Sequence, residues 1–361
     1  MTTRIKHLYV HVPFCNAICF YCDFAHQVYK NDLVDKWLNK LSQEIHNECK
    51  DLYETIYIGG GTPSCLSCDQ LEKLLKLISP YRKNCLEYTV EVNPESIDID
   101  KIKLLKQYGV NRISMGIQSS DDNILKSLNR HHSFADARNK IRLLQDNGFN
   151  NISVDLMYSL PGQSIDILQK SLEDIGDLNV PHISIYSLTI EENTVFGKKG
   201  YKPLDEDTEA DMYDLIRSYL KEKEYINYEV SNFAKRGYES KHNLAYWNYE
   251  DFLGVSVGAS SKIGNRRYTN TRILNKYLEN ISNKDEDLIL DKDDLKFEHI
   301  MMSLRTIYGL DIQRFNDLYK TDFINEYNDI IEGNKLLEIR NDHLICKDLA
   351  LLNSVLLGFL P

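Results

Sequence analysis

The sequence has no apolar run long enough to span a bilayer. The stretch that comes nearest, residues 349–360, is interrupted by Asn353, Ser354 and Gly358, whereas a membrane-spanning helix needs about 20 predominantly apolar residues. No positively charged leader with an apolar core precedes Tyr9, so we expect no secretory signal and no transmembrane segment. These absences predict a cytoplasmic protein.

Basic residues are also fewer than acidic residues. The 43 Lys and Arg residues against 54 Asp and Glu residues give a formal net charge of −11. Because a generic nucleic-acid binder neutralises phosphates with a basic face, the charge balance predicts no nucleic-acid partner. With 42% hydrophobic and 27% charged residues, the composition excludes disordered and fibrous classes and is typical of a globular protein.

Three cysteines are clustered, but the partners that a zinc site usually has are missing. Cys15, Cys19 and Cys22 lie within eight residues, and no second cysteine pair follows closely. A structural zinc ion takes four protein ligands, commonly as two separated pairs. A four-iron cluster held by three cysteines instead keeps one iron open for a substrate or cofactor. The spacing favours a cluster, with zinc as the alternative if a fourth ligand comes from one of the nearest candidates, which are His11, Asp23 and His26.

Short β-branched and aromatic runs alternate with segments of helical period in the first half of the chain. We expect strands at residues 8–12, 55–58, 88–92, 112–117, 152–157 and 182–188. The pattern Leu-Leu, Gly, Asn, Ile-Ser of residues 104–114 recurs at residues 143–153, displaced by 39 residues at every position. This repeat indicates a helix–strand unit that is used more than once. We therefore predict an α/β fold, a partial (βα)6 TIM-like barrel with a parallel sheet.

Glycine-rich and polar segments come at the ends of these strands. The cysteines follow the first strand, residues 59–63 (Gly-Gly-Gly-Thr-Pro) follow the second, Glu91 closes the third, Gln118 ends the fourth, Asp155 lies within the fifth and Thr189 follows the sixth. In a βα barrel the carboxyl ends of the strands meet at one rim, the usual position of the active site. We therefore expect these groups to share one site.

The pattern changes after residue 194. A charged helix at residues 205–224 and an extended piece at residues 227–234 are followed by helices and a hairpin that turns at residues 340–342. We divide the chain into a barrel core (1–195), a barrel extension (196–280) and a small C-terminal α+β domain that is winged-helix-like (281–361). Residues 275–294 are predicted to be the linker. A DNA-contacting wing is disfavoured because acidic residues are plentiful there.

The spacing Cys-x3-Cys-x2-Cys, with Tyr21 before the last cysteine, resembles the radical S-adenosylmethionine (SAM) superfamily. Residues 9–15 and 21–24 resemble one branch of it, which contains oxygen-independent coproporphyrinogen dehydrogenases and haem chaperones. The resemblance implies a [4Fe-4S] cluster on the three cysteines and SAM chelated to the open iron. It implies SAM contacts from the residues at matching positions, which are Tyr9, Tyr21, Gly60, Gly61, Thr62, Glu91, Gln118, Arg130, Asp155 and Thr189. Carboxylates can accept from ribose hydroxyls, and an arginine can hold a carboxylate in a fork.

Residues 242–247, His-Asn-Leu-Ala-Tyr-Trp, resemble the His-Asn-x-x-Tyr-Trp motif of the same branch. The resemblance implies contact with haem, with His242 as an axial ligand, since imidazole is a common haem ligand. The alternative is a core histidine satisfied by its neighbours. Ser260 occupies a position where relatives often carry histidine.

Two features favour the haem chaperones over the dehydrogenases. The dehydrogenases carry a further cysteine two residues after the third and a longer segment before the cluster, whereas here Asp23-Phe24 follow Cys22 and 14 residues precede Cys15. The resemblance thus implies a haem chaperone that delivers haem to haemoproteins of the respiratory chain, with peripheral membrane association, and leaves open whether SAM is cleaved. The alternatives are oxygen-independent coproporphyrinogen III dehydrogenase and a radical-SAM tRNA-modifying enzyme.

Overall fold

The six predicted strands form the centre of one large sheet. The structure is a computed structural model that describes residues 4–83 and 85–360. The central strands are parallel and lie in chain order. They are β1 (His7–Val12), β4 (Thr55–Gly60), β5 (Glu87–Val92), β6 (Arg112–Gln118), β7 (Ile152–Tyr158) and β8 (His182–Ser187). The predicted strands are therefore confirmed to within one or two residues.

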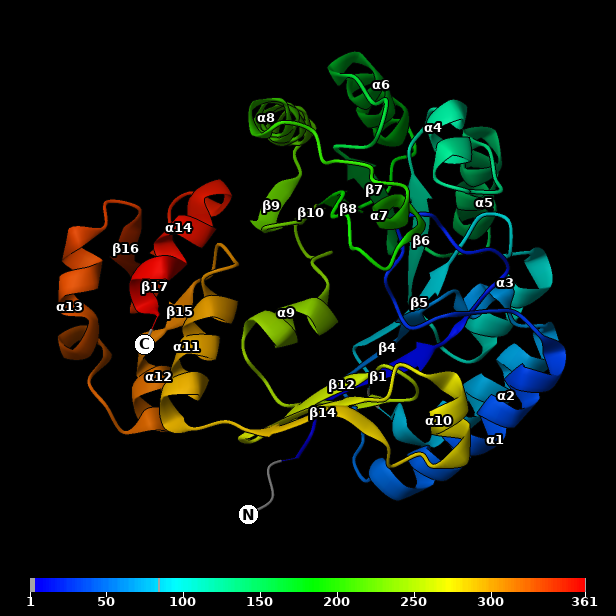
Figure 1. The fold of residues 1–361 in the computed structure, drawn as a ribbon, viewed down its shortest axis with the longest axis horizontal. Helices are drawn as coiled ribbons and strands as arrows, with labels where there is room; N and C mark the ends of the chain where they lie inside the picture. The colour runs from blue at the N-terminus through cyan, green and yellow to red at the C-terminus, as the bar shows by residue number, and fades with distance from the viewer. Residues whose placement is uncertain (1–3, 84, 361) are drawn as a thin grey trace.

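Helices cover the outer face of this curved sheet, as Figure 1 shows. The helices between the central strands are α1 (Asn31–Glu48), α2 (Cys68–Ile78), α3 (Ile99–Gln107), α4 (Asp122–Ser127), α5 (Phe134–Asp146) and α6 (Ile165–Gly176), with short 3-10 turns η1 (Pro63–Cys65) and η2 (Ser79–Tyr81). The repeat seen in the sequence corresponds to α3–β6 and α5–β7. Gly109 and Gly148 follow the two helices with φ of 78° and 80°, the left-handed conformation that glycine adopts at helix ends.

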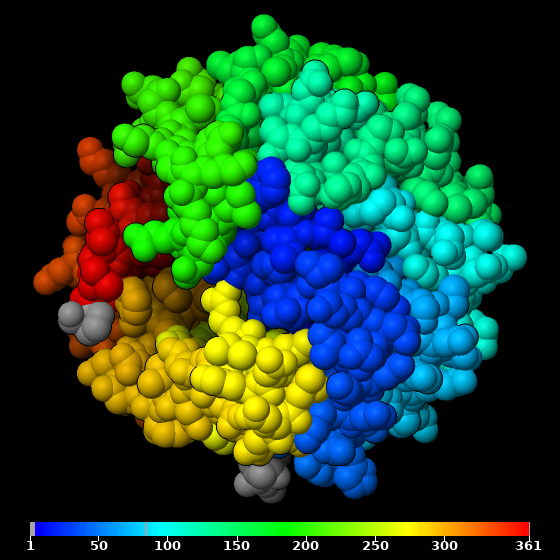
Figure 2. All heavy atoms as spheres, turned by 45° about the vertical axis from the view of Figure 1, so that its right-hand side comes forward, coloured from blue at the N-terminus to red at the C-terminus, as the bar shows by residue number. Residues whose placement is uncertain are grey.

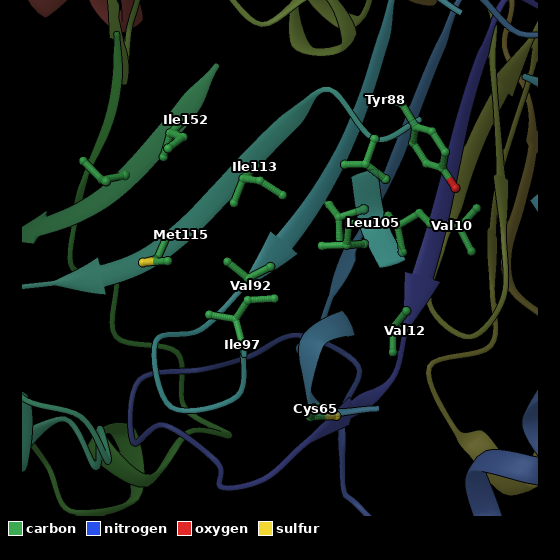
Figure 3. Packing of buried hydrophobic residues seen from close by; sticks show 14 of the residues in the cluster. Val10, Val12, Cys65, Tyr88, Val92, Ile97, Leu105, Ile113, Met115 and Ile152 are labelled. Atoms are coloured by element: carbon green, nitrogen blue, oxygen red, sulfur yellow. The ribbon is translucent and has the colours of Figure 1, made fainter. Parts of the chain in front are cut away.

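The two faces of the central strands have different chemistry. In β1, Leu8, Val10 and Val12 are fully buried in the main core, while Tyr9 and His11 between them face the cavity described below. The other central strands repeat this alternation, because successive side chains of a strand point to opposite faces. Figure 3 shows the apolar side, with side chains of β1, β5, β6 and β7 packed together. The sheet therefore buries its outer face under helices and keeps its inner face for polar groups.

Further strands extend both edges of the sheet. At one edge, β10 (Asn232–Ala234) pairs antiparallel with β8, and β9 (Ile226–Glu229) pairs antiparallel with β10. At the other edge, β11 (Phe252–Val255) pairs parallel with β1. Beyond β11 the order continues with β12 (Ser260–Ile263), β13 (Arg266–Asn270) and β14 (Lys284–Ile289). The helices of this region are α7 (Val195–Lys198), α8 (Glu206–Glu222), α9 (Lys241–Trp247) and α10 (Leu274–Glu279).

The prediction that residues 275–294 form a linker is wrong. This stretch contains most of α10, all of β14 and the start of α11 (Lys292–Ser303). β14 pairs with β13 along its length, but its sequence, Lys-Asp-Glu-Asp-Leu-Ile, is mostly charged and exposed. An edge strand that is charged on both faces lacks the apolar alternation by which strands are recognised.

The C-terminal segment has a separate small core and a separate three-stranded sheet, set to one side of the barrel with α9 between them in Figure 1. Its elements after α11 are β15 (Leu310–Asp311), α12 (Ile312–Tyr319), α13 (Phe323–Gly333), β16 (Leu337–Arg340), β17 (His343–Cys346), η3 (Leu349–Leu351), α14 (Leu352–Leu356) and η4 (Leu357–Phe359). The predicted hairpin is confirmed, with Asn341 and Asp342 both at positive φ, as a two-residue turn requires. The division into three domains stays a prediction. Among residues 4–83 and 85–360, no helix has the length and apolarity needed to cross a membrane.

Replacing Ile58 by alanine should destabilise the barrel. Ile58 is completely buried between the sheet and the helices, and removing such a side chain leaves a cavity that costs about 2–5 kcal/mol. Ile289, on the edge strand β14, is 69% exposed, so Ile289→Ala should change stability by less than about 0.5 kcal/mol. Urea unfolding of the two variants measures the difference, and equal losses would contradict the packing described here.

Candidate functional site

A cavity of about 1060 Å³ opens on the inner face of the sheet. In Figure 2 the blue N-terminal segment occupies the centre of this side of the molecule, and later segments encircle it. The structure brings the predicted cluster and SAM residues together in the cavity wall: Tyr9, Cys15, Cys19, Tyr21, Cys22, Gly60, Gly61, Thr62, Glu91, Gln118, Arg130, Asp155 and Thr189. His242 lies outside this lining and is considered separately below.

The cysteine loop is closed at its base by a short parallel pair of strands, β2 (Phe14–Cys15) and β3 (Gln27–Val28). The Gln27 amide donates to the Pro13 carbonyl over 2.8 Å, and the Tyr29 amide donates to the Cys15 carbonyl over the same distance. On the far side of the loop, the Phe20 amide donates to the Leu128 carbonyl. The loop is thereby closed at its base and attached to the barrel near its middle.

The glycine turn after β4 packs directly on the cysteine loop. The Gly61 amide donates to the Val12 carbonyl over 2.8 Å, and the Thr62 amide donates to the Phe14 carbonyl over 2.7 Å. A Cβ atom on Gly61 would lie 2.6 Å from the Phe14 carbonyl oxygen, and one on Gly60, whose φ is 109°, would lie 2.5 Å from the His11 ring. Only glycine allows this approach, which explains the glycine run in the sequence.

The three thiols have different polar neighbours. The Thr62 hydroxyl and Cys15 Sγ are 3.5 Å apart, Arg130 Nη1 and Cys19 Sγ are 3.5 Å apart, and Cys22 Sγ and His26 Nδ1 are 3.7 Å apart. In the described chain, no three metal-binding side chains converge on a single ion position. A four-iron cluster needs no such convergence, because each of its cysteines binds a different iron.

Burial favours the protonated form of Cys15 and Cys22. It raises the pKa of Cys15 to about 12 and that of Cys22 to about 11. These thiols therefore become thiolates only when a strong cation binds them. Arg130 is buried beside them and donates through Nη2 to the Asn93 side chain and the Gly116 carbonyl, while its Nε has no hydrogen-bond partner in the described residues. A buried guanidinium beside three thiols fits an anionic thiolate cluster, or the carboxylate of a ligand bound to it.

Two carboxylates face the cavity from neighbouring parts of the sheet. Glu91 accepts hydrogen bonds from the Tyr57 hydroxyl over 2.7 Å and from the Gly60 amide over 3.0 Å, and Asp155 accepts from the Ser114 hydroxyl over 3.2 Å. Burial raises the pKa of Glu91 to about 7 and that of Asp155 to about 6. Each group has an oxygen that can accept a hydrogen bond from a hydroxyl or amino group of a ligand in either protonation state.

His242 is buried under the cavity, and both of its ring nitrogens are engaged. Nδ1 is 2.7 Å from the Thr55 hydroxyl, Nε2 is 2.8 Å from the Tyr246 hydroxyl, and the ring stacks on Tyr57. Its exposed fraction is 1%, whereas Tyr246 lines the cavity. His242, the predicted haem ligand, therefore has the surroundings of a core histidine, and the phenol of Tyr246 beside it reaches the cavity.

Sequence reasoning missed some of the cavity's polar and aromatic groups. Tyr57 lies between buried Ile56 and Ile58 in β4, and Tyr186 follows buried Ile185 in β8. The alternation along each strand was the signal that could have placed both tyrosines on the inner face. Asn93 follows directly after β5, and its contact with Arg130 depends on tertiary structure, so no signal in the sequence indicates it.

The Glu91 carboxyl should make the ligand-free protein less stable as the pH rises. Because its folded-state pKa is raised from 4.5 to about 7, its favourable contribution is present below the unfolded pKa and is lost as the pH rises through about 7. Glu91→Gln should remove up to about 3 kcal/mol of that decline. Thermal unfolding of cluster-free protein from about pH 5 to about pH 8 measures this slope. The exposed Glu192→Gln is the control, and identical slopes for the two variants would contradict the assignment.

Comparison with known proteins agrees with the resemblance inferred from the cysteine motif and with the predicted barrel. The family model described as "Radical SAM superfamily" matches residues 9–175. Among curated relatives, "Heme chaperone HemW" of Lactococcus lactis is 35% identical, covering 99% of this chain and 96% of the relative. "Heme chaperone HemW" of Bacillus subtilis is 38% identical, covering 87% of each chain. The structure of coproporphyrinogen III oxidase (HemN) from Escherichia coli, a radical SAM enzyme, superposes with a TM-score of 0.85 over 99% of this chain and 90% of that one; at 21% identity it shows the fold alone. The chain belongs to the HemW family of the radical SAM superfamily.

Proposed function

We propose that this protein is a haem chaperone that binds haem in the cavity on the inner face of the sheet and delivers it to haemoproteins. The observation that carries this proposal is similarity along nearly the whole chain to proteins named for haem chaperoning. The similarity extends beyond residue 175, where the general radical SAM model ends. It therefore includes α9 and the edge strands that complete the cavity.

The cluster and SAM occupy the part of the cavity nearest the cysteine loop in this proposal. As a radical SAM protein the chain uses a [4Fe-4S] cluster and SAM, and Cys15, Cys19 and Cys22 would hold the cluster. When bound, the cluster supplies an electron at an iron that is open to SAM. The chain's own contribution is the arrangement of polar groups around that iron: Arg130 offers its charge and its unpartnered Nε to a carboxylate, while Glu91 and Asp155 offer acceptors to amino and hydroxyl groups.

Haem would occupy the remaining space. The cavity of about 1060 Å³ is slightly larger than the roughly 300–1,000 Å³ usual for small-molecule sites. Flat aromatic surfaces line it, as a macrocycle requires: Tyr9, Tyr57, Tyr186, Tyr246 and Phe252. Arg112 and Arg272 also line it and offer cations to the two carboxylates of haem.

The cellular setting is part of the same proposal. All eight cysteines are free thiols, which fits the reducing cytoplasm. We assign respiratory haemoproteins as recipients, reached by peripheral association with a membrane. The resemblance to the HemW branch is what supports this assignment.

The cysteine loop should bind iron. Protein reconstituted with iron and sulfide without oxygen should hold about four irons per chain. Cys19→Ser should lose most of that iron because a thiolate ligand is removed. Cys68→Ser, at the start of α2, is the matched control and should keep the full complement. Iron and sulfide analysis with electron paramagnetic resonance provides the measurement, and one zinc per chain with no iron would refute the cluster.

The chaperone proposal and its enzymatic alternative can be separated in one comparison. The reconstituted protein should take up ferric haem and transfer it to an apo-haemoprotein, followed by absorbance. With SAM and a reductant it should produce no protoporphyrinogen from coproporphyrinogen III. Steady decarboxylation would identify a coproporphyrinogen dehydrogenase instead, and absence of haem uptake would refute the chaperone.

A further inference from the structure

The cavity floor is connected to the protein surface by an unbroken chain of hydrogen bonds. Tyr246, on the cavity wall, is 2.8 Å from His242 Nε2, and His242 Nδ1 is 2.7 Å from the Thr55 hydroxyl. The same hydroxyl is 2.8 Å from His7 Nδ1, and His7 Nε2 is 3.3 Å from a Glu250 carboxylate oxygen. The Glu250 side chain is 33% exposed. This series of hydrogen bonds thus leads from the cavity to solvent.

The donor of each hydrogen bond in this series can be assigned by starting from Glu250, at the surface end. An ionised carboxylate only accepts, so His7 Nε2 carries a proton, and in the neutral imidazole His7 Nδ1 then accepts from the Thr55 hydroxyl. The Thr55 oxygen then accepts from His242 Nδ1–H, which leaves His242 Nε2 to accept from the Tyr246 phenol. All four hydrogen bonds point the same way, from the cavity toward Glu250.

We propose, on the basis of the haem-binding function proposed above, that the phenol oxygen of Tyr246 is the protein ligand for the iron of ferric haem. His242, Thr55, His7 and Glu250 then form the path by which the phenolic proton leaves. The Tyr246 O–H bond breaks and an iron–oxygen bond forms, with no change in the oxidation state of the iron. His242 Nε2 takes the proton, Nδ1 passes its own proton to Thr55, and one proton reaches Glu250 at the surface.

The buried position of His242 is the first reason for this assignment. To bind iron itself, His242 would have to give up a hydrogen bond at Nε2 or Nδ1 and leave its stacked position against Tyr57. Tyr246 already lines the cavity, and tyrosinate is an established haem ligand in proteins. An imidazole behind the phenol acts as its base, in the way that a ligand's hydrogen-bonded neighbour raises its basicity.

The other tyrosines of the cavity lack such a path. Tyr9 donates to His11 Nδ1 over 2.9 Å, but His11 Nε2 donates to the Ala25 carbonyl, which cannot take up a proton. Tyr57 donates to Glu91 within the cavity itself. Tyr186 is 42% exposed and has no imidazole or carboxylate partner among residues 4–83 and 85–360. Tyr21 also lines the cavity, and among these five tyrosines Tyr246 alone is bonded to an imidazole from which hydrogen bonds continue to a surface carboxylate in the described residues.

The test is the spectrum of the complex with ferric haem. The unaltered protein should show a phenolate-to-iron charge-transfer band and resonance Raman phenolate modes that shift when the protein carries ring-deuterated tyrosine. Tyr246→Phe should lose these modes and bind haem at least about 10-fold more weakly. The control Tyr308→Phe, at an exposed tyrosine outside the cavity lining, should keep both. His242→Gln should keep the phenolate modes with an affinity about 10–100-fold lower, as for loss of a ligand's supporting partner.

Two variants of Thr55 test the path itself, because Thr55 lies outside the cavity lining. Thr55→Val replaces the hydroxyl by a methyl group of the same size and should weaken haem binding by about 10-fold. Thr55→Ser retains the hydroxyl and should restore most of the affinity. Equal losses in the two variants would show that the hydroxyl is not used and would overturn the path.

The remaining outcomes separate the two proposals. A spectrum of imidazole-bound iron that His242→Gln abolishes and Tyr246→Phe leaves intact would overturn the ligand assignment while the chaperone proposal stands. Tyrosine labelling that shifts no mode in the unaltered protein would do the same without any variant, which covers a variant that fails to fold. No haem uptake by the unaltered protein would refute the proposed function and this inference together.

Discussion

The site depends on the close approach of the glycine turn to the cysteine loop. Main-chain hydrogen bonds from Gly61 and Thr62 to the carbonyls of Val12 and Phe14 connect the ends of β4 and β1. A side chain on Gly60 would collide with the His11 ring, and one on Gly61 would collide with the backbone of the loop. The loop residues that follow Pro13 are thereby fixed at the rim, and the thiols face the same space as the carboxylates of β5 and β7.

The two faces of the sheet have different tasks in this arrangement, since one forms the core and the other lines the cavity. The outer face is apolar and covered by helices, so it supplies most of the burial that stabilises the barrel. The inner face is then free to carry Tyr9, Tyr57, Glu91 and Asp155 at no expense to the core. Because these groups stand on strands rather than on loops, their spacing is set by strand register, which is difficult to deform.

The sequence predicts most of the barrel, because strands such as residues 152–157 are rich in β-branched and apolar residues and lie between clear helices. It fails at β14, where the residues are charged and the strand is held mainly by pairing with β13. The cavity lining was recognised through the family resemblance and through the rule that polar groups gather at strand ends. The surroundings of His242 were not predictable, since its contacts with Thr55 and Tyr57 depend on how α9 packs inside the barrel.

The order of strands has a consequence for how the protein is made. β1 is the first strand synthesised, but one of its two neighbours, β11, comes near the end of the sheet's sequence. During translation one edge of β1 therefore stays unpaired, and the cavity lacks part of its lining until Gly258 and Arg272 have been synthesised. The cavity is therefore complete only after the edge strands beyond β8 have been synthesised and paired.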